Sequence, residues 1–296
     1  MRRLRSVLYT PGHRPDRIRK ALATAADSVG LVLEDSVPHD ERAAARVTVA
    51  ASIAEFGPAG RTILVKVNAL GRDGLEADLA HVVVGGLTGL IVPKLNSAEE
   101  VRTVDRLVTA AEARAGLAEG SIALVLMIET PRAVVNAHEL AAASARVASV
   151  ICAAAIDGDL AGALGMQTTP DGLERLYLLS KVLVDARAAG VETPLDGVWT
   201  RIGDLAGLER EARRARSLGY RGKLAIHPEQ IEPINRIFTP TSEEVAHSRR
   251  VIDAFAAALE RKEAAIVVDG VMIDYAMVET ARRVLELAGE LPEAGA

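Results

Sequence analysis

Two carboxylates stand at the ends of apolar runs in the middle of the chain. Glu129 closes the run IALVLMIE, and Asp159 follows VASVICAAAIDG. If these runs are consecutive parallel strands, both carboxylates emerge side by side at the strands' C-terminal ends. Such a pair suits a hard divalent cation such as Mg²⁺, which takes oxygen ligands and keeps water molecules that a substrate can displace. The pair therefore points to an enzyme.

Further charged side chains follow other apolar runs and would lie on the same rim. Taken singly, Glu129 also fits a cap for the helix beginning at Pro131, and Lys94 a solvated loop lysine. His227 also fits a structural histidine. Charged groups gathered in one mouth repel or desolvate one another unless a ligand or metal compensates, so their co-location favours a site. The additional rim candidates are Glu34, Asp35, Lys66, Lys94, Asp196 and His227.

This set of residues would support enolate chemistry. A metal between Glu129 and Asp159 would chelate a 2-oxo or 2-hydroxy acid through its carboxylate and adjacent oxygen, and polarise the carbonyl. Lys66 would neutralise charge developing on an oxygen, while a separate acid or base moves the proton. A Schiff base at Lys66 is the alternative, but a lysine among carboxylates is expected to stay protonated.

The segment TPGHRPDRIRKAL gathers basic residues at the start of the first predicted helix. Arginines at a helix N-terminus form a natural phosphate or carboxylate site. For Arg17 and Arg19 we prefer a solvated basic face. Arg14 stands nearest the preceding strand and is the better candidate for ligand contact.

The elements that must position these residues alternate regularly. Eight apolar runs lack polar alternation, which predicts parallel strands buried on both faces. Helical patterns separate them, and this alternation favours a (β/α)₈ TIM barrel. A doubly wound sheet is the alternative, but no glycine-rich phosphate loop follows the first strand. The predicted strands are 5–10, 29–34, 62–67, 89–94, 122–128, 148–154, 190–195 and 223–227, and the helices 15–26, 38–55, 75–84, 97–115, 131–143, 171–189, 204–218 and 229–237.

The pattern changes after residue 238. Thr241 or Ser242 supplies a helix N-cap signal, and the helix is predicted to run to about 260. The run AAIVVDGVMID predicts a hairpin turning at Asp269-Gly270, and a last helix follows over 275–288. We therefore expect a barrel domain over 1–238 and a C-terminal extension over 239–296.

Composition excludes several classes of function. The chain of 296 residues has a net charge of −5, which does not favour nucleic acid or an anionic membrane surface. No apolar stretch approaches the roughly 20 residues of a membrane span. The single cysteine, Cys152, is expected to be a buried small hydrophobe. We expect a cytoplasmic protein.

Taken together, the motifs resemble the citrate lyase β-subunit-like proteins, relatives of malyl-CoA and citramalyl-CoA lyases in the wider 2-oxo-acid aldolase superfamily. The resemblance runs from Arg5 to about Leu287. It implies a TIM barrel with a C-terminal helical extension, a homotrimer or hexamer, and Mg²⁺-dependent cleavage or formation of a carbon–carbon bond between a CoA thioester and a 2-oxo acid. The motifs that carry it are SVLYTPGHRPDRIRKAL, LVLEDSV, VKVN, VPK, MIET, DGDLAGALG, GKLAIHPEQI, FTPTSEEV and DGVMID.

The resemblance also implies roles for individual residues near the reacting atoms. Glu129 in MIET and Asp159 in DGDL would be the metal ligands. Asp274 in MID matches the family's proposed catalytic acid or base, which acts across the subunit interface. The backbone of Gly158 and Asp159 would help to bind the carboxylate of the oxo acid.

Other matched positions lie further from the predicted metal. Glu34 and Asp35 in LEDSV would hold metal-bound water molecules and orient cations. Arg14 would border the CoA site, together with His227 and Pro228 of the HPEQ segment.

Two positions depart from the family's usual pattern. Lys66 stands where an arginine is usual, which keeps the charge but loses the bidentate fork. Gly158 stands where a glutamate is usual, and Asp157 adds an acid beside it.

The leading hypothesis is thus a Mg²⁺-dependent lyase that splits a 3-hydroxyacyl-CoA, such as malyl- or citramalyl-CoA, into acetyl-CoA and a 2-oxo acid. Water as the final acceptor would make the protein a thioesterase. A CoA-independent 2-oxo-acid aldolase is a second alternative, against which Arg14 argues. A third is a non-catalytic subunit that binds a CoA ester or an acyl carrier, with Lys66 and Gly158 marking lost chemistry.

Overall fold

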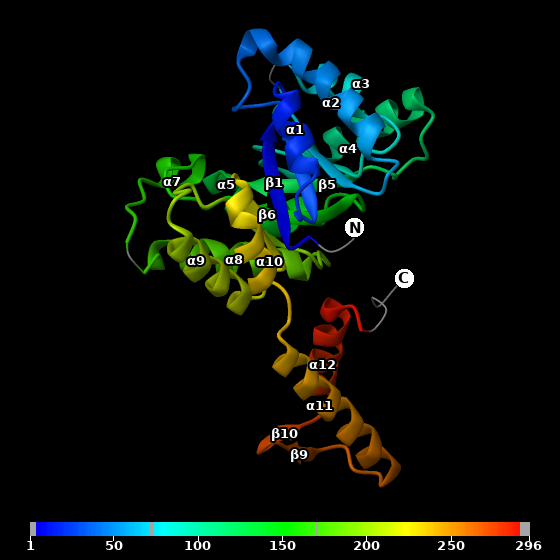
Figure 1. Ribbon diagram of the computed structural model, residues 1–296, viewed down its shortest axis with the longest axis vertical. Coiled ribbons are helices and arrows are strands. Elements are labelled where there is room, and N and C mark those ends of the chain that lie inside the picture. Colours follow the sequence, from blue (N-terminus) through cyan, green and yellow to red (C-terminus); the bar gives the residue numbers. More distant parts are fainter. Residues whose placement is uncertain (1–3, 72–73, 170, 291–296) are drawn as a thin grey trace. The chain divides into compact units, whose positions relative to one another are not determined.

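The computed structural model describes residues 4–71, 74–169 and 171–290 (Figure 1). The chain divides into two compact units, Met1–Arg236 and Ile237–Ala296. We call them the barrel unit and the C-terminal unit.

The barrel unit is a closed ring of parallel strands. Each strand pairs with the next along the chain, and β8 pairs with β1. The predicted (β/α)₈ barrel is therefore confirmed. The strands are β1 (Ser6–Pro11), β2 (Ser28–Val32), β3 (Thr62–Lys66), β4 (Gly89–Val92), β5 (Ala123–Ile128), β6 (Val147–Cys152), β7 (Leu195–Asp196) and β8 (Gly222–Ala225).

Helices follow the strands around the ring, and Figure 1 shows them on its outside. Each predicted helical pattern is present, although several helices begin or end a few residues inside the predicted bounds. The pattern over 131–143 breaks into two helices at Asn136, and an extra helix, α7, begins at Asp159. The helices are α1 (Pro15–Leu22), α2 (Arg42–Phe56), α3 (Leu75–Val82), α4 (Ala98–Ala115), α5 (Pro131–Val135), α6 (Ala137–Ala141), α7 (Asp159–Leu164), α8 (Leu176–Ala188), α9 (Leu205–Leu218) and α10 (Ile231–Ile237), with 3₁₀ turns η1 (His39–Glu41), η2 (Leu173–Arg175) and η3 (Pro228–Gln230).

The strands are buried because both of their faces pack. One cluster takes a residue from each of several strands, as expected for the filled interior of a small barrel. Removing one such side chain, for example by Ile151→Ala, would cost about 2–5 kcal/mol. The cluster is Leu4, Val7, Leu64, Ile91, Val125, Ile151, Leu195 and Leu224, all almost fully buried.

Local signals in the sequence set the helix ends. Ser97 and Glu100 form a capping box at the start of α4, and Gly116 ends that helix in the left-handed conformation, with φ of 66°. Such reciprocal hydrogen bonds satisfy N–H groups that a helix start otherwise leaves without partners.

The C-terminal unit consists of α11 (Ser242–Glu260), a hairpin of β9 (Ile266–Val268) and β10 (Val271–Ile273), and α12 (Tyr275–Ala288). The predicted turn at Asp269-Gly270 is confirmed, since both residues have positive φ, as a type I′ turn requires. Thr241 caps α11. The unit's own core is Val251, Phe255, Ile273, Val278 and Ala281.

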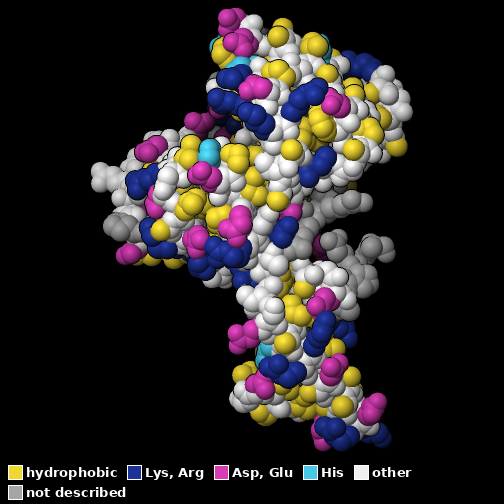
Figure 2. Space-filling model, in the orientation of Figure 1, with side chains coloured by type: hydrophobic (Ala, Val, Ile, Leu, Met, Phe, Trp, Pro, Cys, Tyr) yellow, Lys and Arg dark blue, Asp and Glu magenta, His cyan; other side chains and the backbone are white. Residues whose placement is uncertain are grey.

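Part of the C-terminal unit's apolar surface is exposed. Val267, Val271 and Met272 of the hairpin are 71%, 56% and 58% exposed, and Tyr275 and Met277 of α12 are 59% and 40% exposed. Figure 2 shows apolar side chains at the surface of this unit. We call these five residues the hairpin patch.

Two further expectations from the sequence concern Cys152 and membrane-spanning helices. Cys152 is fully buried, and burial raises the pKa of its thiol to about 12, as expected of an inert small hydrophobe. Among the helices described, none is both long and apolar enough to cross a membrane.

Candidate active site

Strand ends of the barrel unit bring together five charged side chains, which we call the rim cluster. Lys66 ends β3, Asp159 begins α7 and Glu129 follows β5 directly, while Glu34 and Lys94 follow β2 and β4 after one intervening residue. Lys66 Nζ lies 2.6 Å from Glu34 Oε2. Lys94 Nζ lies 3.0 Å from Asp159 Oδ2 and 3.5 Å from Glu34 Oε1. The cluster is Glu34, Lys66, Lys94, Glu129 and Asp159.

Glu129 is the least satisfied member of the rim cluster. The residue is only 5% exposed, yet its Oε1 atom is buried without a hydrogen-bond partner in the part of the chain described. Burial raises the pKa of this carboxyl to about 7, against the opposing field of Lys66. An unpaired buried carboxylate oxygen is costly and needs a ligand to compensate it.

The two lysines of the rim cluster remain charged. Burial by itself lowers the pKa of Lys66, but the carboxylates of Glu129 and Glu34 outweigh it and raise the pKa. Burial likewise opposes a raised pKa at Lys94, where the hydrogen bond to Asp159 prevails. A protonated Lys66 cannot attack a carbonyl, so the geometry disfavours the Schiff-base alternative.

Lys94 belongs to the site more firmly than its sequence position indicated. Its backbone φ is 59°, in the left-handed region that a residue with a Cβ rarely adopts. This conformation lies two residues after the end of β4 and accompanies the contacts of Nζ to Glu34 and Asp159. The interpretation of Lys94 as a solvated loop lysine is wrong. The VPK motif was the signal in the sequence that could have identified Lys94 as a member of the rim cluster.

Tyr9 on β1 is a polar residue that the sequence reasoning missed. Its hydroxyl group is buried and has no hydrogen-bond partner among the described residues. Burial raises the pKa of Tyr9 above its ordinary value, and the negative charges of Glu129 and Glu34 raise it further. The ring lies across Gly30, its register partner on β2, where a Cβ would come within 2.7 Å of the ring. Tyr9 therefore presents a neutral O–H donor near Glu129.

Some predicted site residues make other contacts. Asp35 is 66% exposed in its side chain, with Oδ2 3.8 Å from Lys66 Nζ. The guanidinium of Arg14 contacts Asp16 at 3.3 Å. His227 Nδ1 accepts a hydrogen bond from the Glu229 N–H at the start of η3, whose first residue is Pro228.

Asp196 and Gly158 already have partners within the barrel unit. Asp196 is buried and accepts a hydrogen bond from Lys223 Nζ at 2.6 Å, so its carboxylate is already paired. Gly158 precedes α7, and its N–H donates to Ala155 O.

Asp274 lies in the C-terminal unit, at the start of α12. Its Oδ1 atom accepts hydrogen bonds from the N–H groups of Ala276 and Met277, which caps the helix. Its Oδ2 atom makes no hydrogen bond within the described segments. Tyr275 and Met272 of the hairpin patch flank it in the sequence.

A metal fits the rim cluster through a small donor set. No group of three or more His, Cys, Asp or Glu side chains arranged to hold a metal occurs among residues 4–71, 74–169 and 171–290. Mg²⁺ needs only one or two protein carboxylates, because water and substrate oxygens complete its coordination. The unpaired Oε1 of Glu129 and the neighbouring Asp159 meet that requirement.

Comparison with known proteins gives consistent results. Residues 5–228 match the family described as HpcH/HpaI aldolase/citrate lyase. The chain is 33% identical to an L-malyl-CoA/β-methylmalyl-CoA lyase of Cereibacter sphaeroides, over 96% of this chain and 94% of that protein. It is also 33% identical to a (3S)-malyl-CoA thioesterase of that organism, over 96% and 94%.

A solved structure covers nearly the whole chain. It is that of CitE from Mycobacterium tuberculosis in complex with magnesium, acetoacetate and coenzyme A, 30% identical, with a TM-score of 0.77 over 98% of this chain and 99% of that one.

Proposed function

Because this chain belongs to the HpcH/HpaI aldolase/citrate lyase family and is a lyase, we propose that it cleaves a 3-hydroxyacyl-CoA with Mg²⁺. The substrate is of the malyl-CoA or citramalyl-CoA type, and the products are acetyl-CoA and a 2-oxo acid. The observation that carries the proposal is the unpaired, buried Oε1 of Glu129 beside Asp159 and two charged lysines. That arrangement suits a metal and an anionic substrate.

The rim cluster supplies the metal site. Glu129 and Asp159 would hold Mg²⁺, which when bound polarises the substrate's α-oxygen and neutralises its charge. The corresponding CitE structure holds magnesium, acetoacetate and coenzyme A, which supports the same ligand classes here. The unpartnered hydroxyl of Tyr9 is available as a donor near Glu129, and Glu34 contacts both lysines.

The lysines stabilise negative charge on the substrate. In the cleavage, a base accepts the proton of the 3-hydroxyl group, the C–O bond becomes the carbonyl of the 2-oxo acid, and the C2–C3 bond breaks. Its electron pair passes to the thioester enolate, which takes up a proton at carbon to give acetyl-CoA. Lys66 would be the charged donor for the enolate oxygen, in place of the family's usual arginine, and would bind it as a point charge instead of a bidentate fork.

Asp274 is the proposed base, supplied by a neighbouring subunit. Its Oδ1 atom is held by α12, and Oδ2 is left to accept a proton. The exposed hairpin patch around it is apolar surface of the kind that packs at a subunit interface. We therefore propose a homo-oligomer, a trimer or hexamer, in which residues 239–296 pack on a second copy.

The remaining predicted residues would bind the rest of the substrate. Arg14, at the start of α1, and His227 with Pro228, at η3, would border the CoA moiety. The start of α7 at Gly158 would bind the carboxylate of the oxo acid. Asp35 would orient water near Lys66.

Thioester hydrolysis is the second candidate function, because a (3S)-malyl-CoA thioesterase is as similar to this chain as the lyase is. The two reactions differ in what leaves the enzyme. A lyase releases acetyl-CoA and a 2-oxo acid, whereas a thioesterase releases free CoA and the intact hydroxy acid.

The test is turnover of malyl-, citramalyl- and citryl-CoA with Mg²⁺, following free CoA and oxo acid separately. We expect oxo acid and acetyl-CoA, loss of turnover in Asp274→Asn, and full turnover in the control Asp253→Asn, which alters an exposed aspartate of α11. Free CoA with intact hydroxy acid would establish the thioesterase. Absence of both products, with no effect of EDTA, would contradict the proposal.

A further inference from the structure

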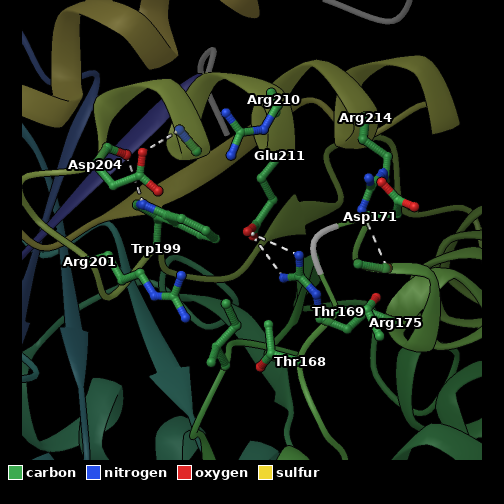
Figure 3. A pocket seen from close by; sticks show the side chains of 13 residues that line it. Thr168, Thr169, Asp171, Arg175, Trp199, Arg201, Asp204, Arg210, Glu211 and Arg214 are labelled. Carbon is green, nitrogen blue, oxygen red and sulfur yellow. Dashed lines mark hydrogen bonds and ion pairs between the residues drawn. The ribbon is translucent and has the colours of Figure 1, made fainter.

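A cavity of about 700 Å³ lies in the barrel unit (Figure 3). It is lined by Ile156 after β6, the segment before α8, the segment after β7 and one face of α9. No member of the rim cluster is among its described lining residues. Its volume falls in the range of about 300–1,000 Å³ that is typical of small-molecule sites.

The floor of the cavity is electrically satisfied. Arg175 Nη1 lies 3.0 Å from Glu211 Oε1, and Lys223 Nζ lies 2.8 Å from the same atom. Lys223 also bonds Asp196 at 2.6 Å. Two cations and two carboxylates thus balance, so Glu211 is not available to neutralise other arginines at the cavity. Lys223 and Arg175 hold the pKa of Glu211 below its usual range despite its burial, so this carboxylate stays charged.

The side chains of two arginines in the lining, Arg201 and Arg210, make no hydrogen bond or ion pair with any residue that the structure describes. Arg201 instead lies over the ring of Trp199, 5.9 Å from its centroid. Figure 3 shows the guanidinium groups of Arg201 and Arg210 extending into the cavity from opposite elements, the loop after β7 and α9.

Asp204, another acidic residue of the lining, is used for local structure. Asp204 caps α9, its Oδ1 accepting from the N–H of Gly207 at 2.8 Å, and its backbone oxygen accepts from Trp199 Nε1 at 2.9 Å. Asp204 therefore builds the wall of the cavity and holds Trp199 beneath Arg201.

A buried donor also points to a ligand. Arg175 is 5% exposed, and its Nε–H has no hydrogen-bond partner among the described residues; the nearest carboxylate oxygen, of Glu174, is 3.8 Å away. Buried guanidinium donors are normally satisfied. A cavity with this unused donor and two unpaired guanidinium groups is built for an acceptor-rich anion.

We propose that this cavity binds a phosphorylated small organic molecule, with Arg201 and Arg210 holding its phosphoryl group. Guanidinium groups match the phosphate oxygens bidentately and stay charged at every relevant pH. The hydroxyl of Thr168, also in the lining, offers a further donor, and the remaining volume accommodates an organic part. None of its described lining residues is among those that the proposed function assigns to the CoA ester, and its test requires no turnover.

The test is isothermal titration of the full chain with ribose 5-phosphate, inorganic phosphate and, as the uncharged control, ribose. We expect saturable binding of ribose 5-phosphate, weaker binding of inorganic phosphate and none of ribose. The double variant Arg201→Gln/Arg210→Gln should weaken binding by about tenfold or more per arginine. Arg213→Gln is the matched control, because Arg213 is an exposed arginine of α9 outside the lining that pairs with Glu209.

Arg14→Gln separates this cavity from the CoA site and should leave ribose 5-phosphate binding unchanged. Both substituted arginines are exposed, so the double variant should unfold at the same temperature as the unaltered chain. Equal affinity in the double variant and the unaltered chain, loss of binding in Arg14→Gln alone, or no saturable binding of either phosphate would overturn the proposal.

Discussion

The rim cluster and a second buried group, which we call the Arg146 cluster, each contain a buried glutamate. The two glutamates differ in whether their carboxylate oxygens have hydrogen-bond partners. In the Arg146 cluster, Glu112 is fully buried and receives Arg146 Nη1 and Nη2 at 2.8 and 2.6 Å and the Ile122 N–H at 2.8 Å. Arg146 also reaches Asp105 and Thr109. In the rim cluster, Glu129 keeps an unpaired buried oxygen.

The pKa values of the two glutamates follow from this difference. Burial acts to raise both, but at Glu112 the hydrogen bonds from Arg146 and the backbone hold the pKa at about 2. At Glu129 burial prevails and the pKa is about 7. A satisfied buried charge fixes local structure, whereas an unsatisfied one marks a place where a ligand completes the protein.

Glu129→Gln should have the largest effect on activity. It should lower kcat/KM by about 10³-fold, the scale of losing one preorganised electrostatic group, and weaken Mg²⁺ binding. The free energy of unfolding without metal should stay level or rise, because a neutral amide costs less to bury than a carboxylate. Steady-state kinetics and urea unfolding measure both. Glu99→Gln, on exposed helix surface, is the control. A Glu129→Gln protein that lost stability but kept its turnover would show that Glu129 is a structural residue and not a metal ligand.

Glu112→Gln should act in the opposite way. It should lower the free energy of unfolding by about 3 kcal/mol, the value of a carboxyl pKa held near 2 instead of 4.5. Turnover per folded molecule should remain, since Glu112 bonds α4 to the start of β5 and to Arg146 before β6, at the strand ends opposite the rim. Urea unfolding and active-site titration measure the two effects. A loss of turnover without a loss of stability would break the comparison.

The pH dependence of stability should have opposite signs for the two glutamates. The contribution of Glu112 should be complete above about pH 4.5 and be lost as the pH falls toward 2, because its folded pKa is lowered. The contribution of Glu129 should be complete below about pH 4.5 and be lost as the pH rises through 7, by up to about 3 kcal/mol, because its folded pKa is raised. Unfolding in chelator across this range, compared with each glutamine variant, measures both signs. Parallel curves would contradict the assignment.

Tyr9→Phe should have the smallest effect. Its hydroxyl has no partner to lose among the described residues, so stability should not fall. Loss of one donor near Glu129 should lower kcat/KM by about tenfold. Tyr177→Phe, on exposed surface of α8, is the control. A destabilised Tyr9→Phe protein with normal kinetics would show that the tyrosine is structural.

Patterns of short range account for what the sequence predicted. Apolar runs without alternation predicted the barrel strands. The cap signal at Thr241 predicted where α11 begins, and the Asp269-Gly270 pair predicted where the hairpin turns. The short β7 and the break at Asn136 were not predicted, because strand pairing and tertiary packing set those limits.

The candidate metal pair, Glu129 and Asp159, was also open to prediction, because the C-terminal ends of parallel strands meet on one rim whatever the details of packing. The roles of the predicted site residues, Asp274 above all, stay predictions until the variants are measured. The resemblance to the family was also open to prediction, because the order and spacing of its motifs are visible in the sequence itself.

Only the tertiary structure decided which charges are paired. Asp196 and Glu129 both end apolar runs, yet Asp196 meets Lys223 and Glu129 keeps a free oxygen. Lys94 bridges Glu34 and Asp159, and the unpaired arginines of α9 and the β7 loop line one cavity. Residue type and spacing fix where a side chain leaves its strand or helix, but a charge is satisfied by atoms within a few ångströms, and the folded chain brings those from distant segments.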